Sequence, residues 1–233
     1  MSLITVVRDV CAVVGVAAPV SVIAAISSNR TMFEMLACAN EMAQRIAYDT
    51  RDWTEMRAST AIVGNGVLDR FPLPANYKRM LLTTNIRRRS TPTQPLRFIS
   101  DHDQWMERAL NGDVDSRGEW ILSGGDIWVS PVLPAGDEII FTYLDKNCIN
   151  LASGGQGDRF QADTDTFRLD ERLLKLGMTF DWKMKKGSPY AEDMGTYSDA
   201  IAMAMGHDKP SPIIVGRFPI QGRVAYHGMV PYP

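Results

Sequence analysis

The sequence predicts an α+β protein: a helical bundle built on an αα-hairpin, with an inserted antiparallel β-rich domain and an extended C-terminal arm. Three observations indicate this organisation. Apolar residues recur every three or four positions in 1–56 and 160–206, which is typical of bundle helices. In 57–150 they follow a period of about two between closely spaced turn residues, as in strands. Residues 207–233 form the arm, because their prolines exclude helix.

The composition is that of a globular chain without a strong overall charge. Its 233 residues are 45% hydrophobic and 22% charged, which is enough to bury a sizeable core. The formal net charge is -2, so any contact with nucleic acid must be local rather than driven by a global field. Cys11, Cys38 and Cys148 are widely spaced in apolar stretches, and we expect them to be reduced core residues.

The first apolar stretch, Val10 to Ile26, is not expected to be a signal peptide or a membrane span. Arg8 and Asp9 interrupt its start, and no basic region precedes it. Gly15 and Pro19 break the run below the roughly 20 residues that a spanning helix needs.

Two helices are predicted before the β-rich domain. The first keeps its apolar residues on one face from Leu3 to Val14 and ends at Gly15. The second begins with a capping box of Thr31 and Glu34 and continues with a regular three-four spacing to about residue 46.

Turn residues divide the β-rich domain into short strands. Gly64-Asn65-Gly66 lies between two strand-like segments, 60–63 and 67–71, and predicts a hairpin. Segments 120–122, 127–129 and 138–143 are separated by further turn residues, so we expect them to form a meander. One short helix is predicted from Asp101 to Leu110.

The αα-hairpin follows a glycine-bearing linker. Its first helix is predicted from an apolar face that runs from Phe167 to Met184, and Gly187 is placed to end it. Ser188 as N-cap and Pro189 at the first helical position predict the start of the second helix. Helices joined by so short a turn must be antiparallel neighbours.

The C-terminal arm combines prolines with apolar side chains. Five of the 13 prolines lie from Pro210 onward. A fully solvated arm would expose much apolar area, so we expect it to lie either on its own domain or on a partner chain. The candidate partner-binding residues are Ile213, Ile214, Val215, Phe218, Ile220, Val224 and Tyr226.

No catalytic signature is recognisable in the sequence. We find no phosphate-binding loop with its lysine, no His-Glu-x-x-His helix, no nucleophile elbow and no dinucleotide glycine pattern. His102, His207 and His227 fall in three different predicted contexts, so a histidine-based site would need long-range convergence. We therefore expect a protein that is not an enzyme, without catalytic residues, bound metal or cofactor.

Two close carboxylate pairs, Asp101 with Asp103 and Asp163 with Asp165, could hold a divalent cation or form an acid and base pair. Each pair directly precedes a predicted helix. Carboxylates there accept hydrogen bonds from free N–H groups and oppose the helix dipole. We therefore expect these residues to cap helices.

The densest charge is the run of Arg87, Arg88 and Arg89. In a ring or tunnel, a few such residues per subunit would sum to a strong field for DNA phosphates. A solvated loop or an ion-paired edge between subunits is the alternative. No aromatic residues are interleaved with the run, which argues against a platform for single strands.

A set of residues in and before the αα-hairpin carries a family pattern. These residues are Asp163-Thr164-Asp165, Leu169-Asp170-Glu171, Leu173-Leu174, Leu176-Gly177, Trp182-Lys183, Lys186-Gly187, Tyr190-Ala191-Glu192-Asp193 and Tyr197. Asn65-Gly66, Leu73-Pro74-Ala75, Pro134-Ala135-Gly136-Asp137 and Lys146-Asn147 follow a similar order and spacing. Together they resemble the head-to-tail adaptor proteins of tailed bacteriophages, the connector or tail-tubular-like subunits that bind the portal.

The resemblance implies a structural subunit of a dodecameric ring in the virion neck, assembled in the host cytoplasm. Its expected partners are the portal protein, the tail or next neck protein, other copies of the chain and the genomic DNA in the channel, with no membrane. In that family the C-terminal segment commonly reaches the portal, and residues 207–233 fit this role as an extended apolar chain. The competing hypotheses are a cell-envelope hydrolase component of a phage tail and a DNA-binding module.

Overall fold

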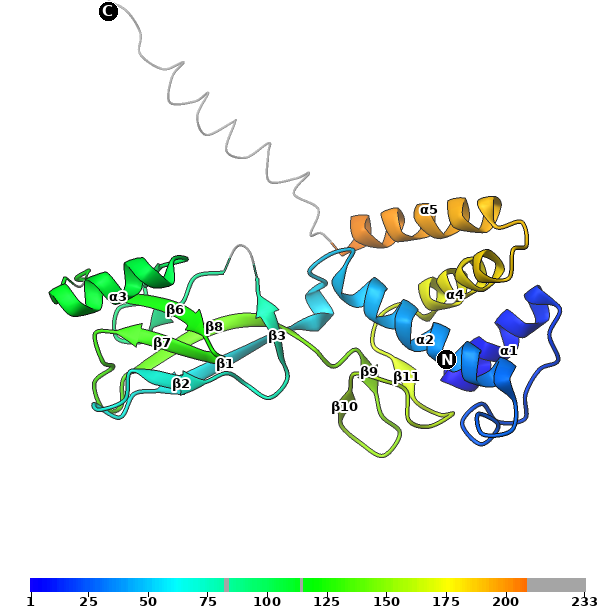
Figure 1. Cartoon of the computed structure of the whole chain (residues 1–233), viewed down its shortest axis with the longest axis horizontal. Coiled ribbons are helices and arrows are strands. Elements are labelled where there is room, and N and C mark those ends of the chain that lie inside the picture. Colours follow the sequence, from blue (N-terminus) through cyan, green and yellow to red (C-terminus); the bar gives the residue numbers. More distant parts are fainter. Residues whose placement is uncertain (82–83, 114, 209–233) are drawn as a thin grey trace, which may run out of the picture.

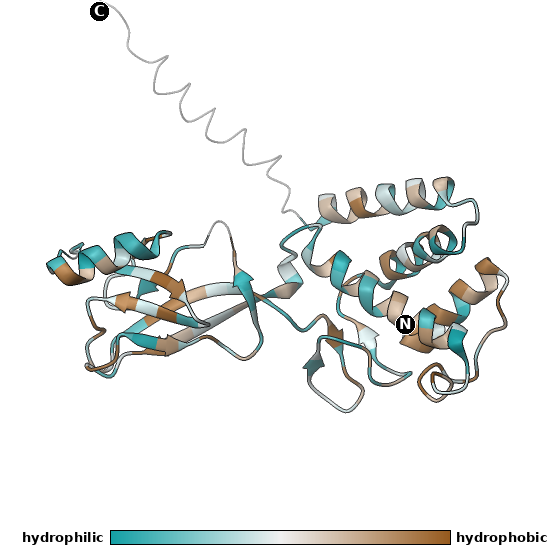
Figure 2. Ribbon diagram, in the orientation of Figure 1, coloured by the Kyte–Doolittle hydropathy of each residue, from teal (hydrophilic) through white to brown (hydrophobic). Residues whose placement is uncertain are grey.

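The computed structural model describes residues 1–81, 84–113 and 115–208. It confirms the α+β class. Most of the helices form one lobe and the strands of the middle of the sequence form a second lobe beside it (Figure 1). Hydrophobic residues gather along the first helix and in the strands of the second lobe (Figure 2). No helix of the described ranges is long and apolar enough to cross a membrane.

The helical lobe is built around α4, which packs against the other three helices of the lobe. These helices are α1 (Leu3–Val14), α2 (Arg30–Tyr48), α4 (Glu171–Lys185) and α5 (Ala191–His207). A small sheet of β9 (Ile149–Asn150), β10 (Gln156–Gly157) and β11 (Thr166–Phe167) closes the lobe. The α4–α5 pair is the expected αα-hairpin.

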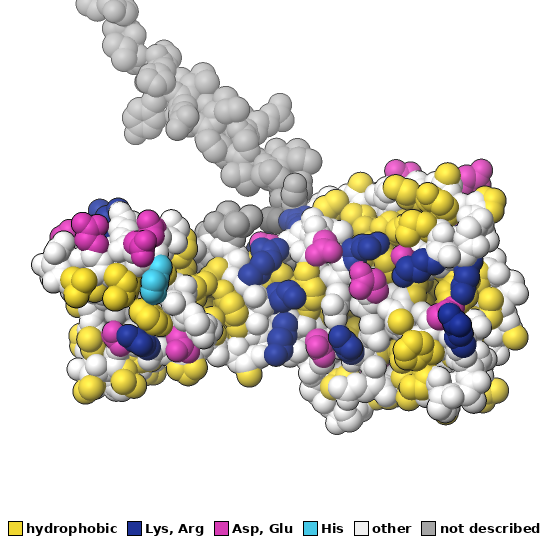
Figure 3. Space-filling model, viewed as in Figure 1, with side chains coloured by type: hydrophobic (Ala, Val, Ile, Leu, Met, Phe, Trp, Pro, Cys, Tyr) yellow, Lys and Arg dark blue, Asp and Glu magenta, His cyan; other side chains and the backbone are white. Residues whose placement is uncertain are grey.

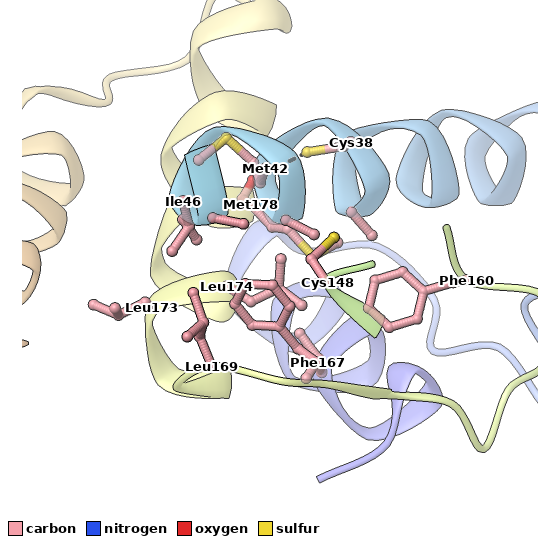
Figure 4. Packing of buried hydrophobic residues seen from close by; sticks show 14 of the residues in the cluster. Cys38, Met42, Ile46, Cys148, Phe160, Phe167, Leu169, Leu173, Leu174 and Met178 are labelled. Carbon is pink, nitrogen blue, oxygen red and sulfur yellow. Dashed lines mark hydrogen bonds between the residues drawn. The ribbon is translucent and has the colours of Figure 1, made fainter. Parts of the chain in front are cut away.

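Apolar side chains from α2, α4 and the small sheet meet in the core of the helical lobe (Figure 4). Met42 of α2 and Met178 of α4 are fully buried there. Cys11, Cys38 and Cys148 are also buried and form no disulfide, which confirms the expectation that they are reduced core residues. Gly177 allows the close approach of three helices, because a Cβ at this position would lie 2.5 Å from Met42 Cε and 3.1 Å from Tyr197 Cε2.

The β lobe is a sandwich of two sheets. Sheet 1 has the order β1-β8-β3, with β4 also paired to β8, and sheet 2 has the order β2-β7-β6-β5. The strands of sheet 1 are β1 (Arg57–Val63), β3 (Tyr77–Met80), β4 (Arg87–Arg88) and β8 (Glu138–Asp145). Those of sheet 2 are β2 (Arg70–Pro72), β5 (Arg97–Phe98), β6 (Glu119–Ser123) and β7 (Asp126–Ser130).

Alternate residues of both sheets fill the space between them. Phe141 and Ile139 of β8 face Ile127 and Val129 of β7 in one buried cluster. On its outer side, sheet 2 is covered by α3 (His102–Asn111), whose Trp105 packs with residues of sheet 2 in a third cluster. The short helix predicted from Asp101 to Leu110 is thus confirmed.

The predicted hairpin at Gly64-Asn65-Gly66 is wrong. β1 pairs with β8, whereas β2 pairs with β7, so the turn carries the chain from one sheet to the other. Its backbone bonds across to a neighbouring turn instead: Gly64 N–H donates to Asp137 O at 2.7 Å, and Gly66 N–H donates to Leu133 O at 3.0 Å. The predicted meander is only partly right, because β6 and β7 form a hairpin but β8 leaves for sheet 1.

The predicted cap of α2 is also wrong. Asn29, not Thr31, is the N-cap, and its side chain accepts a hydrogen bond from Thr31 N–H at 3.0 Å. Glu34 cannot reach back to complete a capping box, because its carboxylate bonds to Arg30 and Lys186.

Both helices of the αα-hairpin begin later than expected. Phe167 lies in β11, and α4 starts after Asp170, whose side chain accepts from Arg172 N–H at 2.8 Å. Ser188 does not cap α5, because that helix begins only at Ala191; the N–H of Ser188 donates to Lys183 O at 2.9 Å and completes the C-terminal turn of α4. The N-cap of α5 is Tyr190.

Arg168 holds the two lobes together. Its guanidinium donates to Asp145 Oδ2 at 3.2 Å, to Asn147 O at 2.6 Å and to Glu55 O at 2.5 Å. It therefore ties the end of β8 to the short 3-10 helix Thr54–Met56, which leads from the helical lobe into β1. An ion pair between Arg79 of β3 and Asp52 joins the lobes at a second point.

Candidate subunit interface

The side chains of the three consecutive arginines alternate between the two sides of sheet 1, so that Arg87 and Arg89 share the outer side and Arg88 lies on the inner side. Arg87 faces outward beside Ile140, and its guanidinium donates to Pro92 O at 2.6 Å. Arg88 lies on the opposite side of the sheet, where its Nη2 is 2.8 Å from the position that a Cβ on Gly118 would occupy. Arg89 pairs with Glu138 at 3.2 Å. The run is therefore not one continuous cationic patch.

Arg87 instead belongs to a larger surface, the outer face of sheet 1, which we call the arginine face. It consists of Arg57, Ser59, Ala61, Arg87, Ile140 and Thr142. β1 and β4 flank β8 on its two sides, so the arginines stand at the edges and the small and aliphatic side chains form the floor. A hollow of about 640 Å³ opens here, lined in part by Arg87, Ile140 and Thr142.

The arginine face is open to solvent in the described part of the chain. The outward residues of β1, including Ala61, are all exposed, whereas the outer side of sheet 2 is covered by α3. Neither Arg57 nor Arg87 has a carboxylate partner among the described residues: Arg57 donates only to the backbone oxygen of Asp52, at 3.1 Å. The face thus offers two cations that are free to bind an external acid.

The second open surface is the outward side of α5. Of its 17 residues only Tyr197, Ala200 and Ile201 are buried. We use the name α5 outer face for Glu192, Gly195, Asp199, Ala202 and Met203, which follow the three-four spacing of a single helical face and are all exposed. Figure 3 shows hydrophobic side chains gathered over α5, with acidic side chains at its upper edge.

α5 is nevertheless firmly attached to the bundle on its inner side. The ring of Tyr197 packs on Phe180 of α4 with the ring centroids 5.1 Å apart, and burial raises the pKa of Tyr197 to about 12. Lys183 of α4 pairs with Asp193 at 2.7 Å. Glu192 and Asp199 form no ion pair within the described ranges, and α5 itself contains no lysine or arginine. The α5 outer face is therefore a rigid, acidic surface.

The carboxylate pairs have structural roles. Asp101 caps α3 as predicted, because its side chain accepts from Asp103 N–H at 2.9 Å. The prediction is wrong for Asp163 and Asp165, whose side chains organise loops and cap no helix; only their backbone oxygens accept from the N–H groups of Ile4 and Leu3 at the start of α1. Asp163 accepts from the N–H groups of Val22 and Ile23, and Asp165 from three N–H groups of neighbouring loops.

Hydrogen bonds lower the pKa of Asp163. Burial by itself would raise this pKa, but the hydroxyl of Ser21 and the N–H groups of Ile23 and Val22 stabilise the charged form and prevail. At neutral pH the charged carboxylate therefore binds residues 21–23 to the linker before α4 through these hydrogen bonds. It is a structural acceptor whose partners are the Ser21 hydroxyl and the two backbone N–H groups.

The remaining titratable groups form no site with metal-binding geometry. Within the described ranges, no three His, Cys, Asp or Glu side chains come together in a way that could hold a metal ion. Cys38 lies 3.2 Å from Asp181 Oδ2, and both burial and this carboxylate raise the pKa of the thiol. Such a thiol is a poor nucleophile, since the reactive species is the thiolate.

The candidate residues of the C-terminal arm, Ile213, Ile214, Val215, Phe218, Ile220, Val224 and Tyr226, lie outside the described residues. Reasoning from the sequence singled out Arg87 but missed the rest of the arginine face, and it missed the α5 outer face altogether. The signal for the arginine face was that the small residues Ser59 and Ala61 alternate with larger residues along one strand. For the α5 outer face it was the small residues at Gly195 and Ala202, which are unusual on the solvent side of a helix.

No family model matches the chain, and no curated protein matches its sequence.

Proposed function

We propose that the chain is a structural head-to-tail adaptor subunit of a tailed bacteriophage, which forms a ring between portal and tail and so seals and extends the DNA channel. The observation that carries this proposal is the open outer face of α5. A bundle helix that buries three of its 17 residues and presents Met203 at 65% exposure suits a surface that another protein chain covers.

The residues that resemble the adaptor family support the proposal through their structural roles. Gly177 and Tyr197 pack against each other where α4 contacts α5. Asp163 holds the N-terminal loop against the linker before α4 by accepting its hydrogen bonds. Trp182 is buried and stacks under the ammonium group of Lys186 at 4.7 Å. These positions thus hold the αα-hairpin in a fixed shape, as a subunit that must repeat around a ring requires.

The proposed partners are the portal protein, the tail or next neck protein, other copies of the chain and the DNA in the channel. The hydrogen bonds of Arg168 fix the β lobe to the helical lobe. Such a fixed arrangement suits a subunit that must hold its neighbours in defined positions. The arm from residue 209 onward is proposed to bind the portal. An extended apolar segment can add to a sheet edge or fill a groove between subunits.

The test is a binding experiment with purified portal rings. We expect the chain to add to the portal in a fixed number of copies, seen by native mass spectrometry and by electron microscopy of the complex. A variant that ends at Asp208 should bind the portal more weakly than the full chain. An absence of portal binding, or turnover of purified cell wall that is lost in Asp101→Asn and Asp103→Asn variants, would contradict the proposal.

A further inference from the structure

We infer that the α5 outer face of one copy packs on the arginine face of a second copy. This contact deepens the proposed function and rests on it, because it names the two surfaces that join neighbouring subunits. The two surfaces are different, so each copy offers one of each and the contact is heterologous. Heterologous contacts build closed rings when the rotation between copies closes.

The arginine face is wide enough for an α-helix to pack on it. β1 and β4 lie on either side of β8, so they are separated by two strand spacings, or about 10 Å. An α-helix with its side chains is also about 10 Å wide. The floor between the two arginines consists of small or aliphatic side chains, Ala61, Ile140 and Thr142, over which a helix can lie closely.

The α5 outer face has the side chains that such a close contact needs. Gly195 and Ala202 are small, and a Cβ built on Gly195 would meet no atom within 4 Å of its own chain. In an exposed helix, glycine lowers stability relative to alanine. A glycine on the open side of α5 is therefore unfavourable for the isolated subunit, but it lets a partner's backbone approach.

The charges of the two faces are complementary. Glu192 and Asp199 are acidic and without an ion pair in the described chain, while Arg57 and Arg87 are basic and lack a carboxylate there. Their spacing can be matched by the reach of the side chains. Seven residues along a helix separate the two acids by about 10 Å. Arg57 and Arg87 differ by four residues along β8, from Leu144 to Ile140, or about 14 Å, and lie about 10 Å apart across the sheet, so their backbone positions are about 17 Å apart. Flexible arginine side chains span the difference.

A second copy explains these features better than DNA does. Of the three consecutive arginines, Arg88 points into the sandwich and Arg89 already pairs with Glu138, which leaves few cations for phosphates. The apolar floor with Ile140 has no use in a phosphate contact. In the contact between two copies, this apolar floor can instead cover the side chain of Met203, which is exposed to water in the single subunit.

A charge-swap experiment tests the contact. Arg87→Glu and Asp199→Arg are prepared separately, each at full length, and their assembly is followed by native mass spectrometry with and without portal rings. Each variant should assemble poorly by itself, because its altered face repels the unaltered one. An equal mixture should regain assembly, since both kinds of contact between the two variants join opposite charges. The restored oligomers should alternate the two variants.

Matched controls separate this effect from loss of folding. Glu107→Arg on α3 and Arg159→Glu near β10 change exposed charges away from both faces, and they should assemble like the wild type. All variants should keep the thermal midpoint of the wild-type monomer to within a few degrees.

The outcomes distinguish the inference from the proposed function. Wild-type rings on the portal together with normal assembly of Arg87→Glu would overturn the inference and leave the proposed function standing. A mixture that stays unassembled would overturn it as well, as would an Arg87→Glu variant that loses only duplex DNA binding, which would assign the face to DNA. A wild-type chain that remains monomeric at its highest soluble concentration and on the portal would overturn both.

Discussion

Replacing Arg168 by methionine should destabilise the protein more than any other single change at a charged residue of the lobe junction. The side chain of Arg168 is 13% exposed, and that of its partner Asp145 is 5% exposed. Methionine keeps much of the aliphatic stem but removes every donor. Asp145 would then retain only the N–H of Asn147, at 2.9 Å, and the carbonyl of Glu55 would lose its partner.

The magnitude follows from the burial of this pair. Removing one partner of a buried ion pair typically destabilises by about 3–5 kcal/mol, because the other charge remains uncompensated. A domain has only about 5–15 kcal/mol of stability in total. We therefore expect Arg168→Met to lower the free energy of unfolding by about 3–5 kcal/mol, which is a large fraction of the whole.

Urea denaturation, followed by far-ultraviolet circular dichroism and tryptophan fluorescence, measures the effect. Arg159→Met is the matched control, since Arg159 is exposed, and it should stay within about 0.5 kcal/mol of the wild type. The double variant Arg168→Met, Asp145→Asn should be less destabilised than the sum of the single variants, because the buried charge is gone. An Arg168→Met protein as stable as the control would refute the role of Arg168 in holding the two lobes together.

Three further outcomes are expected. Gly64→Ala should lower the free energy of unfolding by about 1–3 kcal/mol, because its Cβ would lie 2.5 Å from Leu133 Cβ and 2.6 Å from Pro134 O; chemical denaturation measures this. Asp163→Ala should lower it by about 1–3 kcal/mol at neutral pH. Since the folded pKa of Asp163 lies below its ordinary 3.8, the stabilisation is present above that value and declines as the pH falls through the folded pKa, so thermal melts of the two proteins should converge in acid. Gly195→Ala should raise the stability of the monomer by about 1 kcal/mol in calorimetry and yet weaken assembly in native mass spectrometry. Loss of stability in the last variant would contradict an open α5 outer face.

The helices could be predicted because their signals are local. The apolar spacing of α1 and the glycine at its end determine this element without reference to distant residues, and Gly15 adopts the expected left-handed conformation with a φ of 73°. The caps were less predictable. Ser188 has the chemistry of an N-cap, but it belongs to the turn that ends α4, and α5 begins only at Ala191, a position that depends on the path of the chain.

Strand pairing could not be predicted from turns. Gly64-Asn65-Gly66 has the residues of a tight hairpin, yet its N–H groups bond to a turn about seventy residues further on. β1 pairs with β8 instead, along seven residue pairs from Arg57 to Val63. This pairing depends on how the two sheets pack on each other. Local propensity carries little information about such long-range pairing.

Only Arg87 of the candidate interface could be found from the sequence. The run of arginines suggested one basic patch, but strand alternation separates Arg87 from Arg88, and only the register of β4 on β8 places Arg87 beside Ile140. Similarly, Met194 of α5 has an apolar side chain and yet is 49% exposed. Small residues such as Gly195 reveal an open face only once the buried side of α5 is known.

The most direct measurement of the central claim is a reconstruction of the assembled subunits by cryo-electron microscopy. It would show which surfaces of neighbouring copies touch. We expect α5 of each copy to lie along β8 of the next, between β1 and β4, with Asp199 within ion-pair distance of the neighbour's Arg87. Assembled copies in which α5 and the outer face of sheet 1 both remain in solvent would contradict the account.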